Sequence, residues 1–94
     1  YFDGRMSCIC GTHTHVPTAD VCVLPGGTGY ITDLGMCGSS NGILGVRSDC
    51  IIHKFTVRTP VKFEPAEGNP VLNGAFFEVD EKTGSCMKAE RVTE

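Results

Sequence analysis

The 94-residue sequence predicts a strand-rich α+β domain, and three observations support this prediction. Short segments rich in β-branched and aromatic residues recur along the chain, which is typical of strands. Twelve glycines and five prolines indicate many turns and few long helices. Only the segment that begins near residue 48 spaces its apolar side chains as an amphipathic helix does.

The first half of the chain carries short predicted strands. Residues 6–10 predict a buried strand that ends in the loop Gly-Thr-His-Thr-His at 11–15. Residues 19–24 predict a brief strand or an extended segment, and residues 28–34 predict a further strand. Because Pro-Gly-Gly at 25–27 is a strong turn signal, we expect residues 22–34 to form a hairpin.

The second half begins with a glycine-rich loop at residues 35–45. A short helix is expected to cover residues 50–55, with Ser48 or Asp49 as its N-cap. Residues 71–80 and 85–92 predict two strands, with a possible bulge at Gly74 in the first of them. Gly84 is expected to adopt a left-handed conformation in the loop that joins them.

Composition excludes several classes of function. The net charge is −3 and the eight basic residues are scattered, so we expect no binding to duplex nucleic acid. The apolar runs are much shorter than the ~18 residues of a membrane span, so no membrane partner is expected. A chain of this length is expected to bury ~60–65% of its unfolded surface, which is enough for a modest core.

The six cysteines allow two interpretations. The sequence has no Cys-x-x-Cys pair and no export signal, so we expect free thiols, buried as small apolar side chains at positions such as Cys8, Cys10 and Cys22. Free thiols are typical of the cytoplasm, which is the expected location. A secreted module held together by disulfides is the alternative.

The strongest candidate site is the pair His13 and His15 in the loop at 11–15. A His-x-His segment at the end of a strand places two imidazoles at the rim of a sheet, where metal ligands are common. In an extended loop the two rings point to the same side and can share one ion. If the loop turns between them, each ring can hold one ion of a pair. The alternative is two polar histidines bonded to backbone carbonyls.

Neighbouring polar residues are candidates for supporting roles. Thr12 and Thr14 carry hydroxyls that can orient imidazoles that bind a metal. Asp33 lies at the end of a predicted strand, just before a glycine-rich loop, a position where active-site residues often lie. Alternatively, its carboxylate braces the loop that begins at Gly35.

Several segments carry a resemblance to a known family. They are Asp-Gly-Arg at 3–5, Gly-Thr-His-Thr-His-Val-Pro-Thr-Ala-Asp at 11–20 and Leu-Pro-Gly-Gly-Thr-Gly-Tyr-Ile-Thr-Asp-Leu-Gly-Met-Cys-Gly at 24–38. Lys-Phe-Glu-Pro-Ala-Glu-Gly at 62–68 and Leu-Asn-Gly at 72–74 extend the match over essentially the whole chain. The sequence resembles the YmdB-like metallophosphoesterases, a branch of the calcineurin-like phosphoesterase superfamily.

This resemblance implies an α/β/β/α sandwich with a centre of two divalent metal ions, iron or manganese. It implies hydrolysis of phosphodiesters such as 2′,3′-cyclic nucleotides. His13 and His15 match the paired histidines of the family, one expected on each metal. A hydroxide that bridges the two ions would then attack phosphorus in line.

The same comparison implies an incomplete site. The other metal ligands of the family lie in its amino-terminal half and have no counterpart in this sequence. Residues 1–94 are therefore expected to be a single partial domain, the carboxy-terminal part, that supplies only the His-x-His ligands. The loop at 39–45 also departs from the family pattern, with Asn-Gly-Ile-Leu-Gly at its end.

Two expectations follow for the 94 residues alone. The isolated chain is expected to be inactive and to bind metal weakly or not at all. It is also expected to self-associate, because half a sandwich exposes apolar sheet surface. The alternative function is a non-catalytic structural or binding fragment that lacks a complete metal site.

Overall fold

The computed structural model describes all residues, 1–94, and shows an elongated molecule of 55 × 28 × 17 Å. One helix lies among seven strands, most of them short. In chain order the elements are β1 (Cys8–Cys10), β2 (Cys22–Val23), β3 (Gly29–Ile31), β4 (Gly38–Ser39), α1 (Ser48–Val57), β5 (Pro70–Val71), β6 (Asn73–Val79) and β7 (Cys86–Thr93).

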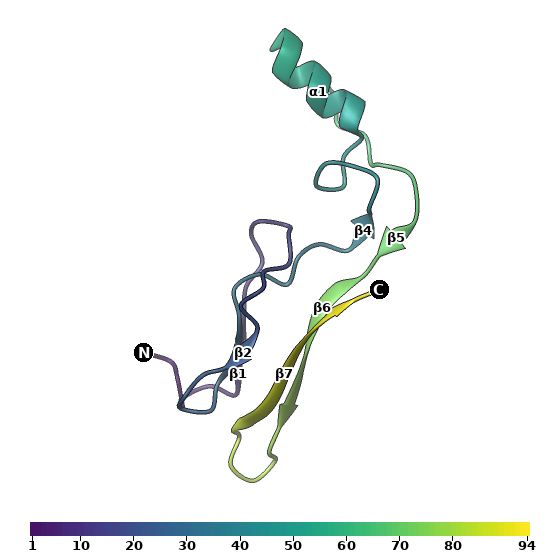
Figure 1. Ribbon diagram of the computed structural model, residues 1–94. Helices are drawn as coiled ribbons and strands as arrows, with labels where there is room; N and C mark the ends of the chain where they lie inside the picture. Colours follow the sequence, from purple (N-terminus) through teal and green to yellow (C-terminus); the bar gives the residue numbers. More distant parts are fainter.

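The strands form three small sheets. The first has the order β1-β3-β2, and the other two are the pairs β4-β5 and β6-β7. The long hairpin of β6 and β7 runs beside the first sheet, while β4 and β5 lead away into an arm that carries α1 (Figure 1). The molecule therefore has a sheet-bearing body and a projecting arm.

The first sheet confirms the predicted hairpin at residues 22–34. β3 lies in the centre, antiparallel to β2 and parallel to β1. The turn at 25–27 is closed by the Leu24 N–H, which donates to the Thr28 carbonyl oxygen at 2.8 Å. Each strand is shorter than predicted, because only two or three residues of each segment pair with a neighbour.

The β6-β7 hairpin corrects the prediction of a bulge at Gly74. Gly74 pairs regularly with Val92, and the irregularity lies between Glu78 and Val79, next to the connecting turn. No atom lies within 4 Å of the position of a Cβ on Gly74, so no close approach distorts the strand there. Gly84 has φ +74 in the turn, which confirms its predicted left-handed conformation.

Helix α1 also corrects a prediction, because neither Ser48 nor Asp49 is its N-cap. Arg47 occupies that position and no side chain caps the helix. The Arg47 guanidinium instead binds the carboxylates of Asp49 and Glu64, each at 2.6 Å. These contacts fix the start of the helix, and Asp49 places a negative charge in its first turn, where the helix dipole favours one.

The core is smaller than the sequence predicts. Only five residues are buried: Thr28, Gly29, Ile31, Asp33 and Cys86. The solvent-accessible surface is 6618 Å², roughly 1400 Å² more than a compact chain of this mass exposes. The chain therefore does not enclose a full core by its own contacts.

The expected burial of the free cysteines is wrong for most of them. All six are unpaired, but only Cys86 is buried, and Cys10, Cys22 and Cys37 are exposed. The cause is the small first sheet, whose edge strands carry Cys10 and Cys22 and are covered by little else.

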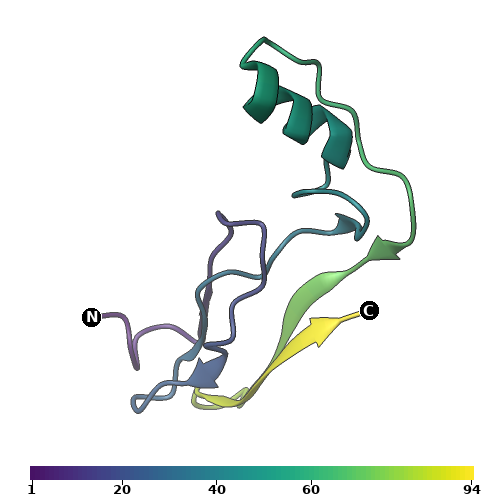
Figure 2. The same ribbon diagram turned by 45° about the horizontal axis from the view of Figure 1, so that its top comes forward.

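The arm exposes much of the apolar surface. Figure 2 shows α1 projecting away from the sheets. Phe55 on this helix is 76% exposed, and Ile52 and Phe63 are exposed beside it. The helix is not long and apolar enough to cross a membrane.

The contact between the hairpin and the first sheet depends on Gly29. A Cβ at this position would lie 2.6 Å from Phe77 Cδ1 and 2.7 Å from Cys86 Sγ. We therefore expect Gly29→Ala to lower the free energy of unfolding by about 1–3 kcal/mol through overpacking. Gly74→Ala is the matched control, expected to be neutral or stabilising by up to about 1 kcal/mol. Urea unfolding measures both, and equal midpoints for the two variants would contradict this packing.

Candidate metal-binding loop

The loop that carries both histidines leaves the first sheet at Gly11. The Gly11 N–H donates to the Ile31 carbonyl oxygen at 3.3 Å, and the Leu34 N–H donates to the Gly11 carbonyl oxygen at 2.9 Å. A Cβ on Gly11 would collide with the Thr32 carbonyl oxygen. Glycine is therefore required where the loop passes the end of β3.

The buried carboxylate of Asp33 holds the loop. It is 1% exposed. Its Oδ2 accepts hydrogen bonds from the backbone N–H of His13 at 2.8 Å, from that of Thr14 at 2.5 Å and from the Thr14 hydroxyl at 2.8 Å. Its Oδ1 accepts one from the Gly35 N–H at 2.8 Å. One side chain thus fastens the histidine loop to the glycine-rich loop.

These hydrogen bonds keep the Asp33 carboxylate ionised. The Gly35 N–H contributes most to lowering the pKa of Asp33, followed by the hydroxyl and N–H of Thr14 and the N–H of His13. Together they outweigh the opposite effect of burial, so the pKa lies well below the usual range. Both carboxylate oxygens are already occupied by the loop, which favours the bracing role over metal ligation.

Asp20 holds the other end of the loop. Its carboxylate accepts hydrogen bonds from the Thr18 hydroxyl at 2.6 Å, from the Thr32 N–H at 3.2 Å and from the Thr32 hydroxyl. The Thr18 hydroxyl, followed by that of Thr32, lowers the pKa of Asp20 to about 2. Two ionised carboxylates therefore anchor the segment that carries the histidines.

The imidazoles themselves are exposed. Neither ring makes a hydrogen bond, so neither is bonded to a backbone carbonyl. The loop bends through residues 13–16 and His15 has φ +66, so the extended arrangement with both rings on one side is not the one adopted. The Met36 N–H donates to the His15 carbonyl oxygen at 3.1 Å and supports this left-handed conformation.

The two threonines between the histidines differ in their contacts. The Thr14 hydroxyl donates to the Asp33 carboxylate at 2.8 Å and so supports the loop. Thr12 is exposed and its hydroxyl makes no hydrogen bond. The proposed contact of either hydroxyl with an imidazole stays a prediction.

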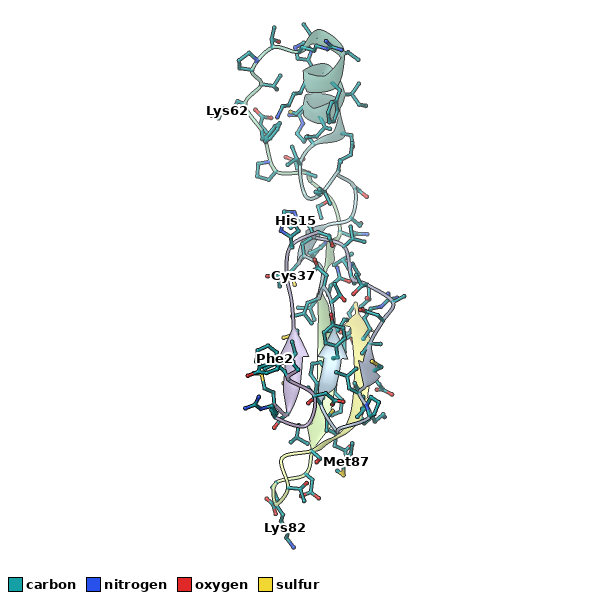
Figure 3. All side chains as sticks on the ribbon, turned by 90° about the vertical axis from the view of Figure 1, so that its left-hand side faces the viewer. Phe2, His15, Cys37, Lys62, Lys82 and Met87 are labelled. Atoms are coloured by element: carbon teal, nitrogen blue, oxygen red, sulfur yellow. The ribbon has the colours of Figure 1, made fainter.

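A cavity of about 350 Å³ opens beside His15. It lies between the histidine loop, which carries His15 (Figure 3), and the base of the arm. The cavity is not lined by His13. Its lining residues are His15, Val16, Met36, Gly38, Ser39, Ser40, Gly42, Leu44, Gly45, Val71 and Asn73.

Sequence reasoning missed most of this lining. The sequence predicted the glycine-rich loop at residues 35–45, but not the pairing of β4 with β5 that forms one wall. That pairing joins residues more than thirty positions apart, and each strand has only two residues.

The histidines suit a metal in chemistry but do not complete a site. Free imidazole nitrogens are good ligands for iron and zinc. No group of three or more His, Cys, Asp or Glu side chains lies close enough together to hold a metal ion. The two imidazoles are therefore candidate ligands, and the chain does not assemble a metal centre by itself.

Comparisons with known sequences match the whole chain. The family model described as YmdB-like protein matches residues 1–92. A Bacillus subtilis protein named 2′,3′-cyclic-nucleotide 2′-phosphodiesterase is 49% identical over 98% of this chain and 35% of its own length. A putative phosphatase/phosphodiesterase of Mycoplasma pneumoniae is 44% identical over 97% of this chain and 33% of its own length.

Solved structures agree with these matches. The crystal structure of a novel phosphatase from Mycoplasma pneumoniae superposes with a TM-score of 0.92 at 41% identity, over 99% of this chain and 34% of that one. A hypothetical protein from Thermus thermophilus gives 0.89 at 35% identity, over 99% and 36% of the two chains. The predicted fold class, a strand-rich α+β part of a metallophosphoesterase fold, is confirmed.

The chain spans about a third of the length of the curated relatives it matches. Within that third the match leaves out no element of the fold, from the first turn to β7. The chain belongs to the YmdB-like protein family.

Proposed function

We propose that this chain is part of a metal-dependent phosphodiesterase, to which it supplies His13 and His15 as metal ligands. The observation that carries the proposal is the loop itself: two imidazoles without hydrogen bonds on a backbone held by the buried Asp33. The names of the relatives, a cyclic-nucleotide phosphodiesterase and a putative phosphatase/phosphodiesterase, support the same chemistry. The proposed substrates are phosphodiesters such as 2′,3′-cyclic nucleotides.

The proposed cofactor is a pair of iron or manganese ions, with one imidazole on each. When bound, the ions supply positive charge that stabilises the phosphoryl oxygens during hydrolysis. The bend at residues 13–16 supports separate roles for the two rings. Because the chain brings only two ligands, we propose that the others come from sequence outside residues 1–94, which form the carboxy-terminal part of one domain.

The residues of this chain hold and orient the ligands. Asp33 fixes the backbone on which His13 and His15 lie, and Asp20 fixes the return of the loop to β3. Both carboxylates are ionised at neutral pH, so the loop keeps its shape under the conditions of hydrolysis. The six unpaired cysteines support a cytoplasmic location, where thiols stay reduced.

The absence of a third ligand favours a second candidate function. In it, these residues form a non-catalytic structural or binding module. The two candidates differ in what happens to hydrolysis when the histidines are replaced in the protein that contains this chain.

His13→Ala and His15→Ala are expected to lower hydrolysis of 2′,3′-cyclic AMP in the presence of Mn²⁺. Each substitution removes a proposed metal ligand. The rate should therefore fall by more than the roughly 10–100-fold that is lost with a residue that only orients a ligand. Initial rates in the protein that contains this chain measure it. His53→Ala, which changes an exposed residue on α1, is the control. Unchanged rates in both loop variants would favour the non-catalytic module.

Asp33→Asn is expected to lower the same rate by roughly 10–100-fold and to weaken Mn²⁺ binding, because the loop loses an acceptor. Asp80→Asn is the matched control. The Asp80 carboxylate also accepts two backbone N–H groups, from Lys82 at 2.7 Å and Thr83 at 3.1 Å, but in the β6-β7 turn. Equal rates for the two variants would show that Asp33 does not position the ligands.

The isolated 94-residue chain is expected to hydrolyse no 2′,3′-cyclic AMP, to bind Mn²⁺ only weakly and to self-associate. Incomplete ligation limits metal affinity, and the exposed apolar side chains favour association. Calorimetry and light scattering measure these properties. Tight stoichiometric Mn²⁺ binding would contradict the incomplete site, and a monomeric scattering peak would contradict self-association.

A further inference from the structure

We propose that the cavity beside His15 binds the nucleobase of a nucleotide substrate. This inference rests on the proposed function, because it assigns a second part of the same substrate. The phosphodiester would lie at the histidines, and the base would enter the cavity that His15 borders. His15 lines the cavity and His13 does not, so only His15 would lie beside the base.

The floor of the cavity is Met36. A Cβ on Gly38 or on Gly45 would lie 2.9 Å from the Met36 methyl carbon. The Met36 methyl group thus packs against two glycines of the glycine-rich loop. Larger residues at these positions would displace the methionine and close the space above it.

Hydrogen bonds hold this floor in place. The Met36 N–H donates to the His15 carbonyl oxygen at 3.1 Å, and the Asn73 side-chain amide donates to the Met36 carbonyl oxygen at 2.7 Å. Asn73 is itself fixed, because its Oδ1 accepts a hydrogen bond from the Thr93 hydroxyl at 3.0 Å. These bonds therefore join the histidine loop, the glycine-rich loop and β6 around the cavity.

The lining suits a flat heteroaromatic ring. Val16, Met36, Leu44 and Val71 give apolar surface, and a methionine thioether makes favourable contacts with aromatic rings. Ser39 and Ser40 also line the cavity, and the Ser40 hydroxyl donates to the Asn69 carbonyl oxygen at 3.4 Å. The Ser39 Oγ accepts the Asn41 N–H at 3.2 Å, which leaves its own hydrogen free to donate to a ring nitrogen or carbonyl.

The size of the cavity limits the ligand. Its volume of about 350 Å³ is at the lower end of the ~300–1,000 Å³ of small-molecule sites. That space suits a single nucleoside unit. A longer oligonucleotide would need basic residues along its path, and none of the lining residues is Lys or Arg.

The test uses the protein that contains this chain, with ¹³C-labelled methionine methyl groups, and adenosine as the probe. The Met36 methyl resonance is assigned from its loss in Met36→Leu. Adenosine at millimolar concentration is expected to shift this resonance saturably and to give a nuclear Overhauser contact between the Met36 methyl and the base protons. Met6 and Met87 are internal controls, because neither lines the cavity and Met87 lies well away from His15, toward the end of the molecule that carries Lys82 (Figure 3).

Two variants locate the binding. Val16→Trp is expected to abolish the shift by covering the mouth of the cavity, and Val57→Trp on α1 is expected to leave it unchanged. Val16 and Val57 are similarly exposed, at 54% and 52%, so neither change should affect folding. The shift and the Overhauser contact in the unsubstituted protein do not depend on either variant.

Three results would overturn the base site: no shift of the Met36 resonance, an equal shift with ribose alone, or a shift that survives in Val16→Trp. Adenosine has no phosphate and the experiment contains no metal. If the Met36 resonance does not shift although hydrolysis is normal, only the proposed base site is therefore ruled out. A normal shift without hydrolysis would remove the proposed phosphodiesterase function and leave a nucleoside site.

Discussion

The site depends on the hydrogen bonds by which the Asp33 carboxylate joins the histidine loop to the glycine-rich loop. The side chain is buried and ionised, and an ionised carboxylate is stable there only with hydrogen-bond donors around it. His13, Thr14 and Gly35 supply those donors, three of them from the backbone. The carboxylate and the loop therefore stabilise each other, because either one alone would leave polar groups unpaired.

The hydrogen bonds of Asp33 also link the histidine loop to the cavity beside His15. The Gly35 N–H that binds Asp33 is followed directly by Met36, which bonds to the His15 backbone and forms the cavity floor. The positive φ of His15 is held between these contacts. Metal ligation by the rings and binding of a base in the cavity would thus share one rigid support, although the side chains involved differ.

Local signals in the sequence predicted the hairpins, the helix and the histidine loop, because Pro-Gly-Gly, Gly84 and apolar spacing act over a few residues. Predictions that depended on distant contacts were less successful. The helix start is set by Arg47 and Glu64, seventeen positions apart, and not by a local cap. Cys10 and Cys22 are exposed because this chain provides little to cover its first sheet. The cavity lining depends on the pairing of β4 with β5. Each of these strands has only two residues, which is too few to leave a recognisable pattern in the sequence.

The most direct test of the hydrogen bonds to Asp33 is a pH titration of backbone amide chemical shifts by nuclear magnetic resonance. Because the folded pKa of Asp33 is lowered, its hydrogen bonds persist as pH falls past the ordinary carboxyl value of about 3.9 and break only at the lower folded pKa. The His13, Thr14 and Gly35 amides are therefore expected to shift together, with one midpoint well below about 3.9. Separate midpoints, or a common midpoint at the ordinary value, would contradict it.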